Sequence, residues 1–271
     1  MTDINFITLL MLTKNERNSI KALRNRENRR QEKRMVVEGN KVVEELLISG
    51  LETLRIYITS GGEFSVIRHL AEKKNVLIIE VSSKDMRIMS SLKSAPGVLA
   101  VGKIRETEAS SVIESMRSKD IKSVGTILIL DDLADPGNVG TLIRTAEWFG
   151  LSGVICSPNT VDVWNSKVIQ SSMGSIFKIP LCIADPVEVL KEFELKAVSL
   201  DIHGEDLYQS DFSPEALVIG SESHGVSEKL GKACHKSWTI PGTGMTESLN
   251  AAIAGAIVTS ELARRCNVKK L

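Results

Sequence analysis

The chain has 271 residues, of which 42% are hydrophobic and 25% are charged, the composition of a globular protein with one large or two ordinary domains. No apolar run is long enough to span a membrane, and the opening segment lacks the basic start and the small-residue cleavage site of a signal peptide. Lys/Arg and Asp/Glu residues both number 34, so the net charge by itself does not indicate a nucleic-acid partner.

The cysteines and histidines favour a protein without disulfides or metal sites. The four histidines show none of the spacings typical of metal ligands, and the four cysteines lie far apart with no C-x-x-C pair. These cysteines are Cys156, Cys182, Cys234 and Cys266. We therefore expect buried, reduced thiols, a cytoplasmic location and no bound metal. Met11 is an alternative start to Met1, since the polar and basic part of the sequence begins soon after it.

A basic segment opens the first part of the chain. Residues 14–34 contain nine Lys/Arg and three Asp/Glu, and we expect a helix over about 15–31. Such a segment either binds RNA phosphates, with Arg26, Arg29 and Arg30 as the candidate contacts, or is an ordinary solvated helix face. The residues alone leave both alternatives open.

Short apolar runs then alternate with helical patterns, which indicates a small α/β domain. A strand at 35–39 precedes an amphipathic helix at about 40–50, which Gly50 ends. Further strands are expected at 54–59, 75–81 and 97–104, and further helices near 64–73 and 83–91.

The polar segment 107–123 predicts a linker, with or without a short helix, between one domain at 1–106 and a second at 124–271. The second domain again alternates short β-rich runs with helices, which predicts a doubly wound α/β fold with a parallel sheet. Its expected strands lie within 124–133, 153–157, 177–183, 195–202, 216–222 and 237–241. Ligands of such sheets bind beyond the carboxyl ends of the strands, where three glycine-rich loops lie in this sequence.

The first loop leads into a helix in "DPGNVGTLIRTAEWFG", residues 135–150. Asn138 is the expected N-cap of this helix and Gly150 its end. An apolar stripe faces the core and consists of Val139, Leu142, Ile143, Ala146 and Phe149. Arg144 lies off that stripe, so it faces either solvent or a site.

The second loop is "LVIGSESHGVSEKL", residues 217–230. Gly220 and Gly225 permit a close approach of a ligand to the main chain, and Glu222 is an exposed carboxylate between them. The spacing differs from that of a dinucleotide-binding loop. The third loop contains "GTGMTES", which lacks the lysine of a phosphate-binding loop and so disfavours a nucleotide-dependent kinase.

The last helix, which "TESLN" opens, is apolar on two sides. One stripe is Leu249, Ala252, Ile253 and Ala256, and the other is Ala251, Gly255, Val258 and Leu262. We expect one stripe to pack on the sheet of its own chain and the other on a second copy, which predicts a homodimer.

The three loops together resemble the SpoU/TrmH family of RNA 2′-O-ribose methyltransferases, in the SPOUT superfamily. The shared motifs are N-x-G-x-x-x-R-T-A from Asn138, G-x-E-x-x-G from Gly220, and Ile240-Pro241 followed by E-S-L-N. The segments "MVVEGNKVVEELL" and "APGVLAV" are similar to the substrate-binding domain of this family, which has a ribosomal-protein-like α/β fold. The resemblance also implies a deep trefoil knot in the C-terminal domain.

The resemblance implies S-adenosylmethionine as the cofactor and assigns site residues by motif. The cofactor-binding residues would be Leu200, Gly220, Ile240 and Leu249. The catalytic residues would be Asn138, Arg144, Glu222, Ser248 and Asn250. Because a guanidinium stays protonated, we expect Arg144 to hold a phosphate and stabilise the developing alkoxide rather than act as a base.

The expected substrate is structured RNA. The additional N-terminal domain and its basic segment favour 23S-type ribosomal RNA, and tRNA is the alternative. A catalytically silent RNA-binding factor with the same fold is a further alternative, which the presence of all five catalytic candidates disfavours.

Overall fold

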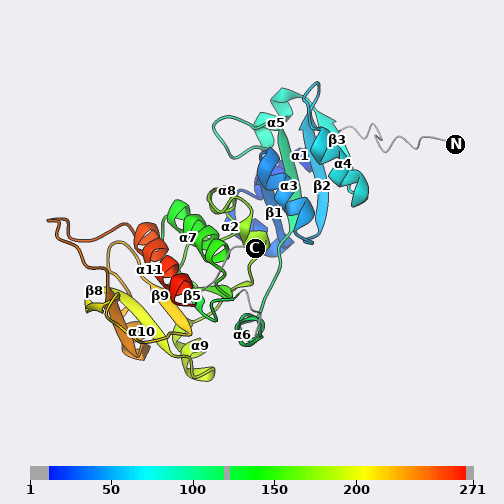
Figure 1. Cartoon of the computed structure of the whole chain (residues 1–271). Helices are drawn as coiled ribbons and strands as arrows, with labels where there is room; N and C mark the ends of the chain where they lie inside the picture. The colour runs from blue at the N-terminus through cyan, green and yellow to red at the C-terminus, as the bar shows by residue number, and fades with distance from the viewer. Residues whose placement is uncertain (1–11, 119–122, 267–271) are drawn as a thin grey trace. The chain divides into compact units, whose positions relative to one another are not determined.

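The structure, a computed structural model, describes residues 12–118 and 123–266, and the chain divides into two compact units (Figure 1). Unit 1 comprises Met1–Arg105 and Trp164–Phe177, and unit 2 comprises Glu106–Val163 and Lys178–Leu271. The choice between Met1 and Met11 as the start lies outside the described residues. No helix in the described part of the chain combines the length and the apolar character needed to cross a membrane.

Unit 1 contains a four-stranded sheet with the order β1-β4-β2-β3. The strands are β1 (Arg34–Glu38), β2 (Thr53–Thr59), β3 (Ile78–Val81) and β4 (Val98–Lys103). β1 and β2 both pair antiparallel with β4, and β2 pairs parallel with β3. Each strand overlaps one of the apolar runs from which a strand was expected, so these four predictions are confirmed.

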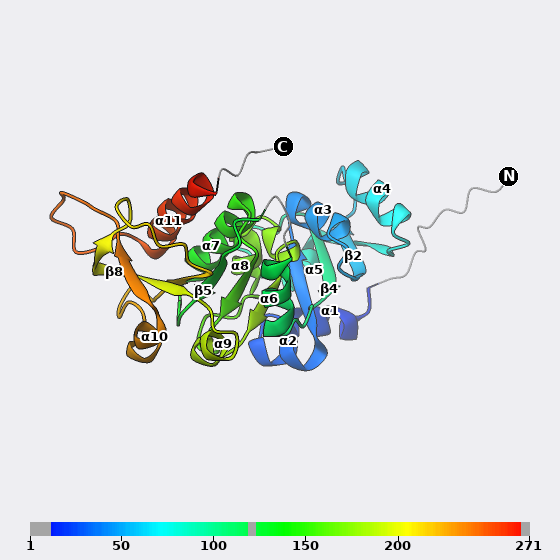
Figure 2. The same cartoon turned by 60° about the horizontal axis from the view of Figure 1, so that its bottom comes forward.

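Helices cover both faces of this sheet, so unit 1 has three layers (Figure 2). One face carries α1 (Lys14–Ala22) and α5 (Ser83–Met89), which contact each other, and the opposite face carries α3 (Asn40–Ile48) and α4 (Ser65–Lys73). The core beneath α1 and α5 is formed by Ile20, Leu23, Val36, Tyr57, Ile79, Val81, Met86, Met89, Leu99 and Val101. Burial of these side chains is the main force that holds the two helices on the sheet.

The basic segment forms two helices, so the prediction of one helix over about 15–31 is wrong. α1 ends at Ala22, and α2 (Arg26–Glu32) begins after Asn25, whose side chain accepts a hydrogen bond of 2.7 Å from the Glu27 amide. Asn25 is thus an N-cap in the middle of the expected helix. Leu23, in the turn between the two helices, is buried in the core beneath α1 and α5.

A segment from the later half of the sequence belongs to unit 1, which the sequence did not indicate. It contains α8 (Ser166–Ser171) and a short 3-10 helix η1 (Ser175–Phe177). The hydroxyl of Ser91 donates a hydrogen bond of 2.8 Å to that of Ser166. Gly174 has a positive φ of 88°, and a Cβ at this position would overlap the side chain of Glu45, so the close contact with α3 requires glycine.

Unit 2 contains a six-stranded sheet with the order β10-β8-β9-β5-β6-β7, and every pairing is parallel. The strands are β5 (Ile127–Leu130), β6 (Gly153–Cys156), β7 (Leu181–Ile183), β8 (Ala197–Asp206), β9 (Ala216–Ile219) and β10 (Lys236–Thr239). The strands β5, β6 and β9 are buried along their whole length, as expected for a sheet with helices on both faces. The predicted parallel α/β fold is confirmed.

Helices cover both faces of this sheet (Figure 2). The first face carries α7 (Pro136–Phe149) and α11 (Ala251–Arg265), and the second carries α6 (Ala109–Arg117), α9 (Pro186–Glu192) and α10 (Glu228–Ala233). The expected polar linker 107–123 therefore contains a helix of the core. Val112, Ile113 and Met116 of α6 are buried against the sheet, because these three side chains share one face of the helix.

The four cysteines are free thiols with different exposures. Cys156 and Cys182 are buried as expected, and burial raises the pKa of the Cys182 thiol to about 11. Cys234 is half-buried, and burial raises its pKa to about 11 as well. Cys266 is exposed, so the expectation of a buried thiol is wrong at this position, which follows the last turn of α11.

Candidate functional site

The three glycine-rich loops leave the carboxyl ends of strands that lie close together in the unit 2 sheet. The order β10-β8-β9-β5 places the loop after β5, the loop after β9 and the segment after β10 at one edge. All these strands are parallel, so their carboxyl ends face the same way. This is the edge where parallel α/β sheets bind ligands.

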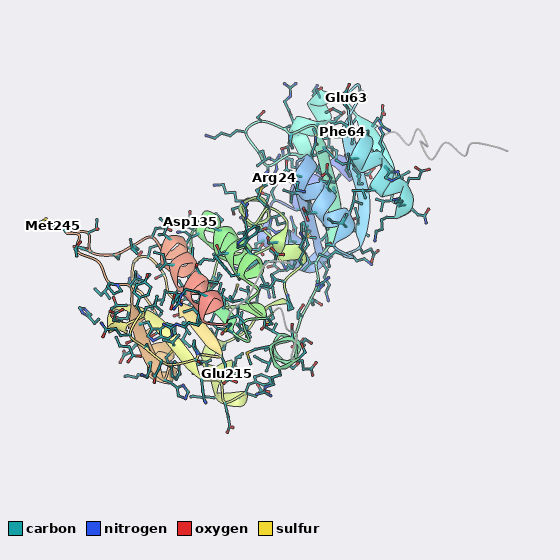
Figure 3. All side chains as sticks on the ribbon, viewed as in Figure 1. Arg24, Glu63, Phe64, Asp135, Glu215 and Met245 are labelled. Atoms are coloured by element: carbon teal, nitrogen blue, oxygen red, sulfur yellow. The ribbon has the colours of Figure 1, made fainter. Side chains whose placement is uncertain are left out.

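The first loop ends in a helix cap that differs from the expected one. The side chain of Asp135 accepts a hydrogen bond of 2.8 Å from the Asn138 amide, and Pro136 occupies the first turn of α7. Figure 3 shows Asp135 at the start of this helix. The prediction of Asn138 as the N-cap is therefore wrong, although the Asp-Pro pair is itself a strong start signal. The side chain of Asn138 is left available for other contacts.

Asn138 connects all three loops through its side-chain amide. Its Nδ2 donates a hydrogen bond to Oε1 of Glu222 in the second loop, and its Oδ1 accepts one of 3.1 Å from Nδ2 of Asn250. Asn250 in turn caps α11, because its Oδ1 accepts from the amides of Ala252 and Ile253 at 2.9 and 3.2 Å. Three of the five catalytic candidates, distant in sequence, thus form one hydrogen-bonded chain.

The second loop is a tight turn held from both sides. Ser221 and Gly225 exchange two backbone hydrogen bonds of 3.0 and 2.9 Å, and Gly225 has a positive φ of 67°. A Cβ at Gly220 would overlap the backbone of Gly225, so only glycine fits there. The buried carboxylate of Asp131, which follows β5, accepts a hydrogen bond of 2.7 Å from the Ser227 amide. No pattern in the sequence indicated this anchoring contact.

The third loop is exposed along its length. All of residues 241–250 are solvent-exposed, and Met245 lies at the outer tip of the segment in Figure 3. Ser248 and Leu249 belong to this segment, and no described hydrogen bond joins Ser248 to Asn138, Glu222 or Asn250. The N-cap of α11 is Asn250 and not Ser248.

Two apolar candidates for cofactor contact lie at the same edge. Ile240 is half-buried directly after β10. Leu200 is half-buried and lies inside β8 rather than at its end, at the point where the pairing with β10 jumps from Ser199 to Glu205. The residues between these two have no partner on β10, and a Cβ at Gly204 would collide with the β10 backbone. Leu200 therefore opens a bulge at the ligand-binding edge.

Arg144 is exposed in the middle of α7, as its position off the apolar stripe predicted. Val139, Leu142, Ile143 and Ala146 are buried, whereas Phe149 is half-buried. Trp148 follows Arg144 by one turn and is 65% exposed. Arg144 is thus presented on the outer face of a helix whose first turn contains Asn138.

α11 is fixed at both ends, which keeps Asn250 in place. Near its start, Gly255 is packed so closely that a Cβ would overlap Leu142 of α7 and Ile219 of β9. At its end, the buried carboxylate of Glu261 accepts hydrogen bonds of 2.7 Å from Arg264 and 2.9 Å from Arg265. The hydrogen bonds from Arg264, followed by those from Arg265, lower the pKa of Glu261 to about 2 against the opposing effect of burial. The carboxylate therefore remains charged at neutral pH.

The three RNA-binding candidates have different environments. Arg26 and Arg30 are exposed on α2. Arg29 is only 5% exposed, and its guanidinium donates hydrogen bonds of 2.6 and 2.8 Å to the carbonyl oxygens of Leu23 and Arg24. Arg29 satisfies the carbonyl groups that the end of α1 leaves without helical partners. Its expected role as an exposed phosphate contact is corrected to a structural one.

Comparisons with known proteins agree with this geometry. The sequence matches the model of the SpoU rRNA Methylase family over residues 125–260 and that of the MRM3-like substrate binding domain over residues 15–100. The first match contains all three loops and Arg144, and the second contains most of unit 1.

Individual relatives cover nearly the whole chain. An uncharacterized tRNA/rRNA methyltransferase of Archaeoglobus fulgidus is 31% identical over 82% of this chain and 96% of its own length. The 23S rRNA (guanosine(2553)-2′-O)-methyltransferase RlmP of Bacillus subtilis is 28% identical over 89% of this chain and 93% of its own length. The solved structure of an AdoMet-bound rRNA methyltransferase from Sinorhizobium meliloti superposes with a TM-score of 0.80 at 26% identity, covering 94% of this chain and 96% of that one. With the two domain matches and the assembled loops, these similarities show that the chain belongs to the SpoU rRNA methylase family.

Proposed function

We propose that the protein is an S-adenosylmethionine-dependent methyltransferase that methylates a ribose 2′-hydroxyl in structured RNA, with 23S-type ribosomal RNA as the favoured substrate. The observation that carries this proposal is the side chain of Asn138, which joins Glu222 and Asn250 at the ligand-binding edge of the sheet. Two relatives whose names give them as 23S rRNA 2′-O-methyltransferases support both the reaction and the class of RNA.

The residues at this edge fit S-adenosylmethionine. The tight turn at Gly220 leaves main-chain groups accessible to a ligand, and the half-buried Leu200 and Ile240 offer apolar surface for an adenine ring. Leu249 would join them from the exposed third loop. When bound, the cofactor supplies a methyl group already activated on a sulfonium. S-adenosylmethionine should raise the melting temperature of the purified protein, and a rise with ATP alone would contradict the assignment.

The protein's own side chains would orient the ribose and assist the loss of the proton from its 2′-hydroxyl. The guanidinium of Arg144 stays protonated, so it is suited to hold the phosphate beside the reacting ribose and to stabilise the alkoxide as the 2′-hydroxyl releases its proton to solvent. Asn138 and Asn250 position the loops around the nucleotide, and Glu222 is held by Asn138. Ser248 is assigned to the same site by its motif and would contact the nucleotide from the third loop.

The homodimer, the knot and the cytoplasmic location are further parts of this proposal. Ile253 is 55% exposed and Leu249 is exposed as well, whereas Val258 and Leu262 on the other side of α11 are buried within the chain. One apolar stripe of α11 is therefore satisfied internally, and Leu249 and Ile253 of the other are available to a second copy. The trefoil knot and the cytoplasmic location rest on the family resemblance.

Mapping of 2′-O-methyl groups would test the proposed reaction and substrate. We expect one site in 23S-type ribosomal RNA to be unmethylated in a strain that lacks the protein, and to be restored by purified protein with S-adenosylmethionine. Loss of a tRNA site instead would assign tRNA as the substrate. If no site changes although the protein binds S-adenosylmethionine and RNA, the catalytically silent factor is the better assignment.

A further inference from the structure

The zero net charge of the chain conceals opposite charges on its two units. Unit 1 contains 20 Lys/Arg and 12 Asp/Glu, an excess of eight positive charges, and unit 2 contains 14 Lys/Arg and 22 Asp/Glu, an excess of eight negative charges. Phosphate binding depends on local positive charge, so unit 1 rather than unit 2 is the part of the chain suited to hold RNA.

The positive charge of unit 1 is concentrated in one of its two helical layers. The helices α1, α2 and α5 together contain eight Lys/Arg and four Asp/Glu. The helices α3 and α4 on the opposite face contain three Lys/Arg and three Asp/Glu. An excess of four positive charges therefore lies in the first group of helices and none in the second.

Some of the arginines of the basic segment form contacts with α5. The guanidinium of Arg17 forms an ion pair of 2.6 Å with Asp85 of α5. Arg24 donates a hydrogen bond of 2.8 Å to the carbonyl oxygen of Ile88 and a second to that of Ser90. Figure 3 labels Arg24, which lies on the surface of unit 1. These contacts neutralise the one acidic residue of α5 and fix α5 beside α1.

The remaining cations of α5 are exposed. Lys84 and Arg87 are three residues apart, so they project from the same side of the helix, and both are solvent-exposed. On the adjoining helices, Lys21, Arg26 and Arg30 are exposed as well. Asp85, the acidic residue of α5, is ion-paired with Arg17, and Lys84 and Arg87 form no described ion pair within this helix.

We infer that the face formed by α1, α2 and α5 binds the phosphate backbone of the substrate RNA, and that Lys84 and Arg87 are contacts in it. This inference rests on the proposed RNA substrate and extends the binding surface to a helix that the sequence had not singled out. The contacts to phosphates fix the position of the RNA and carry no base specificity. Selection of the methylated nucleotide then falls to unit 2.

A matched pair of double substitutions tests this inference. K84E/R87E reverses two charges on the basic face, and K73E/K74E reverses two exposed lysines at the end of α4 on the opposite face. Both change the net charge of unit 1 by the same amount, so any difference between them is a local effect. Binding of 23S-type ribosomal RNA is measured by filter binding at several salt concentrations, and S-adenosylmethionine binding by the shift in melting temperature.

We expect K84E/R87E to weaken RNA binding by about tenfold or more at low salt and to reduce the slope of log K against log salt by about 1.4 to 1.8, the value for two phosphate contacts. K73E/K74E should change both quantities much less. K84Q/R87Q, which introduces no new negative charge beside Asp85, should show the same reduction in slope.

Equal effects of both charge reversals would overturn the inference, because they would mean that the total positive charge of unit 1, and not this face, attracts the RNA. An unchanged slope of log K against log salt in K84E/R87E would also overturn it. Failure of the proposed function has a different signature. In that case the unmodified protein itself transfers no methyl group and gains no stability from S-adenosylmethionine.

Discussion

The two units use their polar side chains in different ways. In unit 1, arginines such as Arg24 and Arg29 bond to main-chain carbonyl groups, and the exposed cations act on a ligand as a distributed charge. In unit 2, Asn138, Glu222 and Asn250 bond mainly to one another, and their positions depend on three separate loops. Removal of one charge from a charged surface lowers its affinity for RNA only in part. Removal of one member of a hydrogen-bonded chain leaves the other members without their partner and no longer held in position. The effects of substitutions should therefore be large and specific in unit 2 and smaller and salt-dependent in unit 1.

The largest effect is expected for Arg144→Ala. Loss of the group proposed to stabilise the alkoxide should reduce the rate of methyl transfer by about 100- to 1000-fold. Arg144 lies on the exposed face of α7, so the melting temperature and the gain in stability with S-adenosylmethionine should stay unchanged. Methyl transfer to ribosomal RNA from the deletion strain measures the rate. A rate close to that of the unmodified protein would remove Arg144 from the mechanism.

A smaller but still large effect is expected for Asn138→Ala. The change leaves Glu222 and Asn250 without their shared partner, and we expect the rate of methyl transfer to fall by about ten- to 100-fold, equivalent to about 1.4 to 2.8 kcal/mol. The matched control is Asp135→Ala, which removes the α7 cap three residues earlier and costs about 1 kcal/mol of stability. If both variants lose stability and activity in the same proportion, Asn138 has only a structural role.

In unit 1, R26E/R30E should weaken RNA binding by about tenfold at low salt and flatten the salt dependence, while S-adenosylmethionine binding stays unchanged. Arg29→Glu, a charge reversal in the same helix, should have a different effect from R26E/R30E. It places a carboxylate beside the carbonyl groups that Arg29 now satisfies, so the melting temperature itself should fall. A normal melting temperature for Arg29→Glu would contradict the structural role of this residue.

The proposed dimer predicts different effects for substitutions on the two sides of α11. Ile253→Asp should give a monomer by light scattering at micromolar concentration, because Ile253 is exposed in the single chain and the dimer would bury the new charge. Gly255→Asp should instead unfold unit 2, because this position is enclosed by Leu142 and Ile219. A monomeric unmodified protein would refute the dimer.

Local patterns in the sequence predicted the elements well because burial imposes its own periodicity. The strands of both sheets and the exposed position of Arg144 follow from the alternation of apolar residues. The errors concern contacts that local patterns do not specify. The division between α1 and α2 depends on buried Leu23 and Arg29, and the membership of α8 in unit 1 depends on residues more than 70 positions away, such as Ser91. The cap at Asp135 is a different case, because the Asp-Pro signal was present and Asn138 was chosen instead.

In the candidate site, the motifs shared with the SpoU/TrmH family pointed to Asn138, Glu222 and Asn250, but not to how they would be joined. The hydrogen bond between Asn138 and Glu222 spans 84 positions, and that between Asn138 and Asn250 spans 112. Such pairings follow from the order of the strands in the sheet. The sequence predicted a parallel sheet but not that order.

The smallest effect on methyl transfer is expected for Glu261→Gln at the far end of α11. The hydrogen bonds from Arg264 and Arg265 lower the pKa of Glu261 from its ordinary value of 4.5 to about 2 in the folded state. A carboxyl group with a lowered folded pKa stabilises the fold above the unfolded value and loses that contribution as the pH falls through the folded one. We therefore expect the variant to be less stable than the unmodified protein by about 2 kcal/mol at pH 7, the typical size for hydrogen bonds to a charged group. The difference should shrink between pH 4.5 and about 2.

Thermal unfolding at neutral and acidic pH measures this difference, and Glu228→Gln provides the control. Glu228 forms an ion pair with Lys232 in which both side chains are exposed, so its loss should change the melting temperature little at any pH. A constant difference between Glu261→Gln and the unmodified protein down to pH 2 would mean that packing, not the charge of Glu261, holds the end of α11. Methyl transfer at neutral pH should be nearly unaffected, because Asn250 is fixed at the opposite end of the helix by its own bonds to Asn138 and to the first turn.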